Sequence, residues 1–515
     1  MHSRYLLRAG AAGLAISLAA TSATAQKSKD QLRFGFYQPM SMVDTIYDPR
    51  PEGEIMSRSV YDTLITYDAV KRKYIPHVAQ SWKRIDDKTI EFKLRQDLKF
   101  HNGSDLDADD VVYTFNFATN PKNKFRFKGS RFGWMAGIDK IDKFTVRVRS
   151  KTVYAPFFSR MSNTPPVYPS DIHSKLAKAV TFGHNPVGTG PYRVASVDKN
   201  KGVVLIKNTD YKLASLGKPA GKIGRIHIFP IPDRQTQLAN MLTGAQDIMY
   251  NVDKDQAKSL AANPDFRVKV LSSVAFSYVT FDAAGRTKNK VFKDQRVRKA
   301  LMLAVDRKEL LKLVHDDIAG DPLQQAMCHS WHQGCASTTK TTGYDPAQAK
   351  RLLAEAGLAN GFETSILTWG PSKPMAEAVA GMWRKIGVRA KVNFQPIIGF
   401  IRARAANKAE TMVTLWDNGV GQVDVDTTMG FFFLKGSRNY THDNRLTNAV
   451  MAGRKELNLE KREAIYAKAF DLVNKENYFK PLIPLPAVIV HHKDVKLLGG
   501  HKNPKGFELN RITWN

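Results

Sequence analysis

The chain has 515 residues, of which 43% are hydrophobic and 10% are aromatic. This length exceeds what one hydrophobic core serves, so we expect two or more domains. The 78 Lys and Arg against 48 Asp and Glu give a formal net charge of +30, a balance that can attract nucleic acid, anionic membranes or anionic solutes. The basic residues are scattered, as in Lys122 to Lys128 and Lys288 to Lys293, so we interpret them as a solvated surface.

The N-terminus has the three parts of a secretory signal peptide. Arg4 and Arg8 form a basic region, residues 9–20 are apolar, and Ala23-Thr-Ala25 is a small-x-small cleavage site. The apolar run is too short to span a bilayer, which favours a cleaved signal over an uncleaved anchor. We therefore expect a periplasmic protein of a Gram-negative bacterium, a location that argues against nucleic acid as a partner. No later stretch is long and apolar enough for a transmembrane helix.

The first half of the chain alternates between strand and helix signals. Residues 31–37 alternate apolar and polar side chains, which predicts a strand. Asp107-Ala-Asp-Asp110 places acidic groups where a helix dipole favours them, so a helix is expected to begin there. Further strands are predicted at residues 89–94, 145–148 and 203–206.

The second half carries clear helix boundaries. Strands are predicted at 267–270 and 277–281, Asp294 and Asp306 each open a helix, and a third helix begins at Asp345-Pro346 and ends at Gly357. A strand at 363–367, a helix at 375–386 and a strand at 389–394 form a βαβ unit, which implies parallel strands with a right-handed crossover. Asn458 caps a helix that runs to about Val473, and the prolines of residues 478–485 indicate an edge strand or crossover.

The βαβ unit points to one candidate binding residue. Ligands of open α/β sheets bind beyond the carboxyl ends of the strands, and the loop Thr368 to Lys373 occupies that place. Trp369 in this loop is a candidate pocket wall. The alternative is that Trp369 packs on its own domain.

Two cysteines stand close together in Cys328-His-Ser-Trp-His-Gln-Gly-Cys335. In an oxidising compartment a local disulfide is the expected outcome. The alternative is a metal site that adds His329 and His332 to the two thiolates, but the spacing fits no zinc pattern. We expect the disulfide.

Enzyme motifs are missing from the sequence. Gly188-Thr-Gly190 lacks the third glycine of a dinucleotide fingerprint, and no P-loop, H-E-x-x-H or G-x-S-x-G occurs. Asp424 and Asp426 share one face of an extended segment and could bind a cation or act as an acid–base pair; we favour two solvated loop carboxylates. We expect no enzymatic activity, no metal and no cofactor.

Several segments, in order along the mature chain, carry a family resemblance. These segments are Ala79 to Trp82, Phe92 to Phe115, Asn185 to Tyr192, Val291 to Arg307 and Tyr344 to Gly357. They resemble the signature of the peptide-type (family 5) solute-binding proteins of bacterial ABC importers.

The resemblance implies an α/β protein with a two-lobe periplasmic-binding-protein fold, type II-like, and an accessory domain inserted in the first lobe. The chain would cross between lobes near Val274 and return near Pro484, which makes these crossings the hinge. The implied divisions are a signal peptide at 1–25, lobe I at 26–75, 181–274 and 485–515, the accessory domain at 76–180, and lobe II at 275–484.

Ligand contacts are expected at the cleft and the crossings. Positions that line the cleft in similar proteins lie after the first strand and after Leu415, and aromatic side chains lie at the first crossing. Each has core packing as its alternative. With Trp369, the candidates are Gln38, Met40, Trp134, Phe276, Tyr278, Trp416, Asp417 and Asn418.

The segment after Trp416 departs from the peptide-binding pattern. Family members that bind peptides carry W-x-x-D-x-x-D-P, whose first Asp holds the peptide ammonium, whereas here Gly419 stands at that position and the Pro is missing. Either Asp417 substitutes in a reshaped loop, or the ligand has no free amine. Similar proteins also carry nickel chelates, haem, oligosaccharides and opine-like molecules.

The predicted function is a monomeric periplasmic substrate-binding component that delivers a peptide or peptide-like solute to an inner-membrane ABC permease. A receptor of the same fold for an opine, oligosaccharide or metal chelate is the first alternative. A secreted hydrolase, suggested by Asp424 and Asp426, is the second. A chaperone-like or adhesive role, suggested by the positive charge, is the third.

Overall fold

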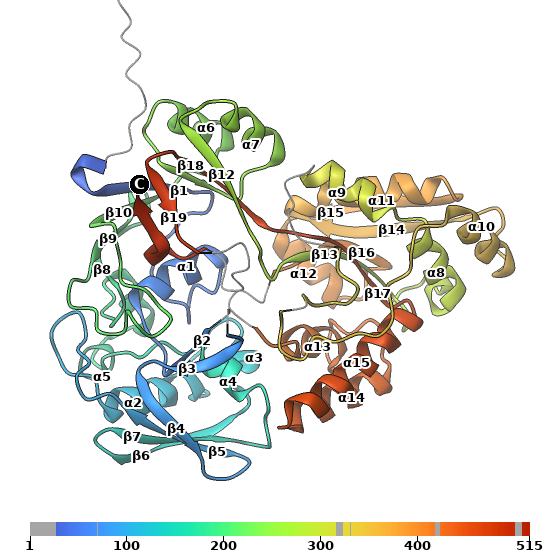
Figure 1. Ribbon diagram of the computed structural model, residues 1–515. Coiled ribbons are helices and arrows are strands. Elements are labelled where there is room, and N and C mark those ends of the chain that lie inside the picture. The colour runs from blue at the N-terminus through green and yellow to red at the C-terminus, as the bar shows by residue number, and fades with distance from the viewer. Residues whose placement is uncertain (1–26, 69–70, 316–322, 330, 418–422, 500–506) are drawn as a thin grey trace, which may run out of the picture.

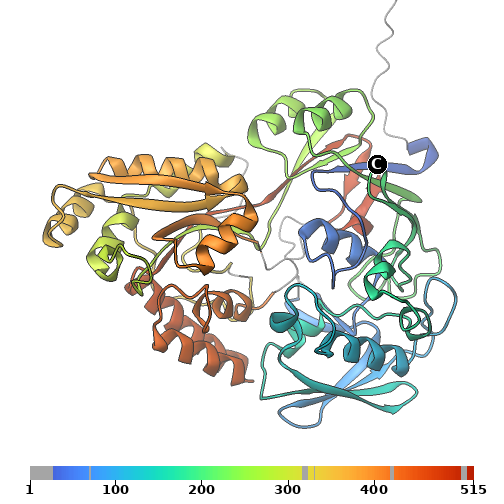
Figure 2. The ribbon, with the colours of Figure 1, turned by 180° about the vertical axis from the view of Figure 1, so that it is seen from behind.

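The computed structural model describes residues 27–68, 71–315, 323–329, 331–417, 423–499 and 507–515. Their strands form sheets of seven, five and four strands and two ribbons of two strands. We name the part built on the seven-stranded sheet the first lobe, the part built on the four-stranded sheet the accessory region, and the part built on the five-stranded sheet the second lobe. In Figure 1 the first lobe and the accessory region lie on the left and the second lobe on the right; Figure 2 shows them from behind.

The sheet of the first lobe is assembled from distant parts of the sequence. Its strand order is β12-β18-β11-β1-β10-β9-β8, and β1 pairs in parallel with β10 and β11. The predicted alternation in β1 places Leu32, Phe34 and Phe36 in a hydrophobic core. The strands are β1 (Gln31–Phe36), β8 (Tyr192–Asp198), β9 (Gly202–Lys207), β10 (Arg225–Pro230), β11 (Ile248–Tyr250), β12 (Phe266–Leu271) and β18 (Ala487–His492); the helices are α1 (Pro51–Val60), α6 (Arg234–Leu242) and α7 (Lys254–Ala261), and β19 (Val495–Leu497) pairs with β20 (Ile512–Trp514).

The accessory region is an antiparallel sheet of order β4-β5-β7-β6 covered by helices. Asp107 and Asp110 form a capping box at the start of α2, as the acidic first turn predicts. The elements are β4 (Ala79–Arg84), β5 (Thr89–Leu94), β6 (Met135–Asp142), β7 (Thr145–Ser150), α2 (Ala108–Thr119), α3 (Lys128–Phe132), α4 (Phe157–Met161) and α5 (Ser170–His173), and the ribbon β2 (Ile65–Asp68) with β3 (Lys73–Pro76) adjoins them.

Two of the segments that carry the family resemblance contact each other. The backbone N–H of His101 donates to the carbonyl of Gly188 over 2.8 Å, and the His101 ring bonds the carbonyl of Gly190 over 2.9 Å. A Cβ at Gly188 would lie 2.1 Å from the carbonyl oxygen of Val60, so only glycine fits there. These segments therefore join the accessory region to α1, and their sequence pattern reflects the scaffold.

The second lobe contains the predicted βαβ unit. Strands β14 and β15 pair in parallel with α11 as the crossover, in a sheet of order β15-β14-β16-β13-β17. Strand β14 continues through Thr368 and Trp369, which pair with Phe394 and Gln395, so the predicted loop begins two residues later. The elements are β13 (Phe276–Phe281), β14 (Phe362–Trp369), β15 (Val388–Gln395), β16 (Thr411–Trp416), β17 (Phe479–Pro484), α8 (Gln295–Leu303), α9 (Arg307–His315), α10 (Pro346–Glu355), α11 (Lys373–Arg384), α12 (Ile397–Ala405), α13 (Asp426–Phe433), α14 (Asn444–Lys455) and α15 (Leu459–Lys475).

The predicted caps of the second lobe are confirmed. Side-chain oxygens of Asp294, Asp345 and Asn458 accept hydrogen bonds from the first-turn N–H groups of α8, α10 and α15. Asp306 accepts from Lys308 and Glu309 at the start of α9. These bonds satisfy backbone donors that a helix cannot pair internally, which explains why the boundaries were readable from sequence.

Two strand crossings connect the lobes. The chain passes from β12 of the first lobe to β13 of the second, and it returns from β17 to β18. The crossings are hydrogen-bonded to each other: Ser273 Oγ donates to Leu485 O over 2.8 Å and Leu485 N donates to Ala275 O over 3.1 Å. In Figure 1 they run side by side. Among the described residues, no helix combines the length and apolarity needed to cross a bilayer.

Substitution of Trp383 tests how much core packing stabilises the second lobe. Its side chain is fully buried, and its indole N–H donates to the carbonyl of Leu301 over 2.9 Å. We expect Trp383→Ala to lower the free energy of unfolding by about 3–5 kcal/mol, because it leaves a cavity and an unpaired carbonyl. Urea denaturation measures the loss. Lys385→Ala, an exposed control near the end of the same helix, should change stability little; equal effects would contradict this account of the core.

Candidate functional site

The end of strand β16 meets charged groups from the other parts of the molecule. Burial raises the pKa of the half-buried Asp417 to about 6, and the carboxylate of Glu52 in α1 raises it further, whereas Arg126 of the accessory region opposes the shift. Interactions between charges weaken with distance. The carboxyl end of β16 is therefore within electrostatic reach of both the first lobe and the accessory region.

An aromatic cluster lies beneath this position. Phe276 and Trp416 are partners across the β13–β16 pairing, and the rings of Tyr278 and Trp416 lie 5.2 and 5.3 Å from that of Phe432. Phe276, Tyr278 and Trp416 are all buried in one core cluster. The structure thus brings three predicted ligand residues together, and it gives each of them a packing role.

The other predicted residues are dispersed. Gln38 is half-buried after β1, while Met40 is fully buried in the core of the first lobe. Trp134 stacks on Tyr154 with ring centroids 5.2 Å apart, inside the accessory region. Trp369 is half-buried, with its ring 6.4 Å from that of Phe400. Ligand contact by these side chains stays a prediction, and Asn418 lies outside the described residues.

A basic and aromatic cluster, absent from the sequence predictions, borders the same place. The guanidinium of Arg438 lies 4.2 Å from the ring centroid of Phe431, and that of Arg404 lies 5.6 Å from it. Phe431 in turn contacts Trp416, with ring centroids 4.5 Å apart. We call Arg404, Arg438 and Phe431 the arginine cluster. The rule that ligands bind at the carboxyl ends of parallel strands gave no signal for Arg404, because this residue lies in the last turn of helix α12, which begins after strand β15.

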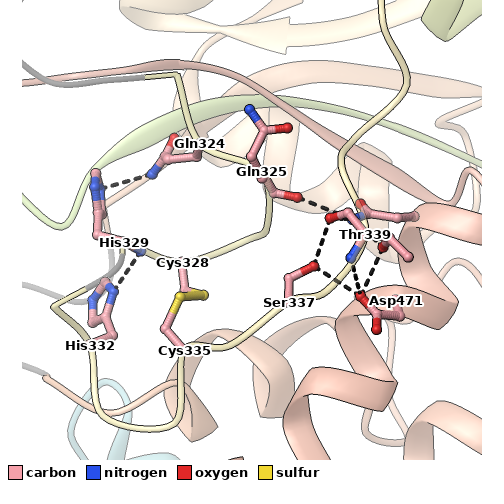
Figure 3. The surroundings of a disulfide bond; sticks show 10 residues. Gln324, Gln325, Cys328, His329, His332, Cys335, Ser337, Thr339 and Asp471 are labelled. Carbon is pink, nitrogen blue, oxygen red and sulfur yellow. Dashed lines mark hydrogen bonds between the residues drawn. A yellow bond between two sulfur atoms is a disulfide. The ribbon is translucent and has the colours of Figure 1, made fainter.

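The predicted disulfide is confirmed. Cys328 and Cys335 are bonded, with Cα atoms 5.9 Å apart. Figure 3 shows that the neighbouring histidines bond within the loop: His329 pairs with Gln324 over 2.9 Å, and the His329 backbone N–H donates to Nδ1 of His332 over 2.9 Å. The cysteine sulfurs are thus engaged with each other. In the part of the chain that the structure describes, no group of three or more His, Cys, Asp or Glu side chains is arranged to hold a metal ion.

The disulfide loop, residues 328–335, also contacts strand β3 of the ribbon that adjoins the accessory region. Tyr74 of β3 donates its hydroxyl to the Gln333 side chain over 2.7 Å. The Gln333 backbone donates to Val423 O over 2.7 Å and accepts from Val425 N over 3.1 Å. The disulfide loop therefore positions the segment that leads into α13.

The structure contradicts the sequence interpretation of Asp424 and Asp426. They were expected to be solvated, but they are only 3% and 0% exposed. Asp424 accepts two bonds from Arg462, at 2.6 and 2.7 Å, and Asp426 pairs with Arg454 at 2.6 Å and with Arg160 at 3.3 Å. The sequence interpretation failed because the arginines are distant in sequence. With their oxygens facing guanidinium groups, the two carboxylates are not placed as a cation site or an acid–base pair.

The Asp426 pair with Arg160 joins two parts of the molecule. Arg160 belongs to α4 of the accessory region, whereas Asp426 and Arg454 belong to the second lobe. The backbone N–H of Ala155 also donates to Arg454 O over 2.6 Å. Burial disfavours the charge of Asp426, but Arg454 and Arg160 together lower its pKa. This buried ion pair holds the accessory region against the second lobe.

A small cavity of about 20 Å³ lies elsewhere, beside α1. None of the predicted ligand-binding residues lines it. Its residue Glu54 is already paired with Arg131 over 2.6 Å. Its lining residues are Thr45, Glu54, Ser57, Arg58, Tyr61, Thr63, Asn163 and Pro166.

Two lobes joined by paired crossings, with charged and aromatic groups meeting at the strand ends between them, define a solute-binding protein of the two-lobe type. The family model for bacterial extracellular solute-binding proteins, family 5, matches residues 73–440, which is more than half of the chain. The chain belongs to this family. The predicted family and fold class are thereby confirmed.

Individual relatives differ in what their names say they bind. Haem-binding protein A of Haemophilus influenzae is 26% identical over 85% of this chain and 80% of its own length. A glutathione-binding protein of Salmonella paratyphi A is 25% identical over 94% of both chains. A solved structure, the periplasmic binding protein DppA of Helicobacter pylori in complex with the peptide STSA, has a TM-score of 0.78 at 20% identity, covering 95% of this chain and 100% of that one.

Asp426 provides a test of the buried ion pair. Asp426→Asn leaves Arg160 and Arg454 without a counter-charge, so we expect unfolding to become easier by about 3–5 kcal/mol at pH 7. Because the pKa of Asp426 is lowered, the difference should shrink as the pH falls through that pKa. Asp139→Asn, which breaks an exposed pair with Arg149, should cost less than about 1 kcal/mol in the same urea titration. Similar losses for both variants would show that burial of the pair contributes nothing.

Asp417 provides a test by pH. Its pKa of about 6 lies above the ordinary 3.8, so the folded protein holds this proton more tightly and loses stability as the pH rises from about 4 to about 6. Asp417→Asn should therefore stabilise the unliganded protein at pH 7 by about 1–3 kcal/mol, with no difference below about pH 4. Thermal unfolding across this range measures the effect, and the exposed Asp87→Asn is the control. A stability gain that does not vary with pH would refute the assignment.

Proposed function

We propose that this protein is the periplasmic substrate-binding component of an ABC importer, which encloses a peptide or peptide-like solute between its lobes and delivers it to an inner-membrane permease. One observation carries the proposal: Asp417 of the second lobe lies within electrostatic reach of Glu52 of the first lobe and Arg126 of the accessory region. Membership of the extracellular solute-binding family supports it. Sites enclosed by several parts of a chain bury most of a small ligand.

The proposed division of the chain follows its topology. Residues 26–75, 181–274 and 485–515 would form the first lobe, residues 76–180 the accessory domain, and residues 275–484 the second lobe. The paired crossings would act as the hinge, because few dihedral angles there need to change for the lobes to approach. Removal of residues 1–25 on export would place a monomeric protein in the periplasm.

Asp417 is the proposed partner of a ligand ammonium group. The carboxylate makes no ion pair among the described residues and bonds to its own backbone N–H, and Glu52 adds a second acidic group nearby. A cation between the two carboxylates would relieve their repulsion. This arrangement favours the reading in which Asp417 replaces the aspartate missing at position 419.

A peptide screen tests the proposal. We expect di- to tetrapeptides to raise the melting temperature of the mature protein in a saturable way, because a ligand at 100 times its Kd adds about 2.7 kcal/mol of stability. Native mass spectrometry should show one intact peptide per protein. A broad library that gives no stabilisation would reject a peptide ligand.

Other outcomes identify the alternatives. Conversion of peptide to cleaved product by the purified protein would indicate a hydrolase. Weak, non-saturable and salt-sensitive binding would indicate a chaperone-like role. Saturable binding of only a non-peptide solute would indicate a receptor of the same fold with another ligand.

A further inference from the structure

Two side-chain contacts join the second lobe to the side of the molecule that carries the accessory region. The hydroxyl of Tyr74 in β3 donates to Oε1 of Gln333 in the disulfide loop over 2.7 Å. The guanidinium of Arg160 in α4 pairs with Asp426 at the start of α13 over 3.3 Å. In Figure 1, β3 and α4 face α13 below the paired crossings. These contacts are thus separate from the covalent connection between the lobes.

The disulfide loop supports the second-lobe half of both contacts. The backbone N–H of Gln333 donates to Val423 O over 2.7 Å, and the Gln333 carbonyl accepts from Val425 N over 3.1 Å. This short parallel bridge ends directly before Asp426. The side chains of Gln333 and Asp426 are therefore held by one local structure, although they are distant in sequence.

Close packing leaves this local structure little freedom. Gly334 has a φ of +80°, and a Cβ there would lie 2.7 Å from Cγ2 of Val425, so glycine is favoured at this position. Asp424, between Val423 and Val425, accepts two hydrogen bonds from Arg462, at 2.6 and 2.7 Å. The disulfide bond closes the loop covalently and restricts the conformations open to it. Without that bond, we expect the second-lobe half of both contacts to lose its alignment.

Opening of the lobes would break both contacts. Tyr74 and Arg160 precede the first crossing, whereas Gln333 and Asp426 lie between the two crossings. A rotation at the crossings moves these two sides as separate bodies, and a hydrogen bond is lost once its heavy atoms are more than about 3.5 Å apart. Both contacts are made by the chain alone. They therefore act in the solute-free protein as well.

We propose that Tyr74, Arg160, Gln333 and Asp426 form a latch that favours the closed arrangement of the lobes, and that the disulfide bond positions the second-lobe half of this latch. The inference rests on the proposed closure of the lobes and adds contacts that set its equilibrium. The latch shifts the solute-free protein toward the closed form, and a bound solute shifts it further. Because a solute leaves only after the latch has opened, the latch also slows dissociation.

Small-angle X-ray scattering of the solute-free protein tests the latch. The latch variant Tyr74→Phe/Arg160→Met removes both contacts. It leaves Asp426 paired with Arg454 over 2.6 Å, so the second lobe keeps its own ion pair. We expect this variant to have a larger radius of gyration than the wild type, because it populates the closed form less.

Tyr344→Phe/Arg147→Met is the matched control. Tyr344 is exposed in the second lobe, and Arg147 pairs with Glu91 inside the accessory region, so neither residue belongs to the latch. The control should scatter like the wild type. Tyr74→Phe alone, which removes one hydroxyl, replaces the latch variant if thermal unfolding shows that the latter is not folded. A wild-type radius of gyration for the folded variant would overturn the inference.

Cys328→Ser/Cys335→Ser tests the positioning role of the disulfide. We expect this variant also to have a larger radius of gyration without solute. Adding the latch substitutions should give no further increase, because the same contacts are already weakened, whereas a general loosening of the protein would add to their effect. Additive increases, or a wild-type radius for the serine variant, would overturn the role of the disulfide.

Peptide release supplies a second readout. With the peptide from the screen that raises the melting temperature most, the latch variant should release peptide at least about threefold faster, as the loss of buried hydrogen bonds implies. Unchanged release would contradict the inference. A screen in which no peptide binds would count against the proposed function, but the solute-free comparison of the radii of gyration would still decide whether the latch exists.

Discussion

The paired crossings between the lobes are the constraint on which the rest of the structure depends. Both sheets continue through them: β12 pairs with β18 on one side and β13 with β17 on the other. The bonds between Ser273, Ala275 and Leu485 hold the two passages together. Besides these segments, the buried pair of Asp426 with Arg160 joins the second lobe to the accessory region. The two large sheets have separate hydrophobic cores, so the proposed change of angle between the lobes would leave each core intact.

The charged groups between the lobes differ in whether the chain itself supplies their counter-charges. Asp426 is matched by Arg160 and Arg454, so that contact between the accessory region and the second lobe is electrostatically complete. Asp417, Arg404 and Arg438 lack such partners among the described residues. A complete set stabilises the assembly of the parts, whereas an incomplete set is suited to a charged solute. The contrast between these two sets supports the proposed site more than the aromatic residues do, because Phe276, Tyr278 and Trp416 are buried in a core cluster.

The features that could be predicted from the sequence are those that depend on interactions between residues close together in the chain. Helix starts at Asp294, Asp345 and Asn458 were readable because a cap acts on donors two or three residues away. The strand content of the βαβ unit was readable from its apolar pattern. The site was less accessible: Arg404, Phe431 and Arg438 come from separate segments, and no spacing rule connects them. Asp424 and Asp426 were misread for the same reason, since their partners are fixed by tertiary folding alone.

Closure of the lobes around a solute is the central claim, and small-angle X-ray scattering tests it most directly. The mature protein would be measured alone and with a saturating concentration of a peptide that raises its melting temperature. We expect a smaller radius of gyration with the peptide, because the proposed hinge at the paired crossings would let the lobes enclose it. An unchanged radius of gyration at demonstrated saturation would contradict the account.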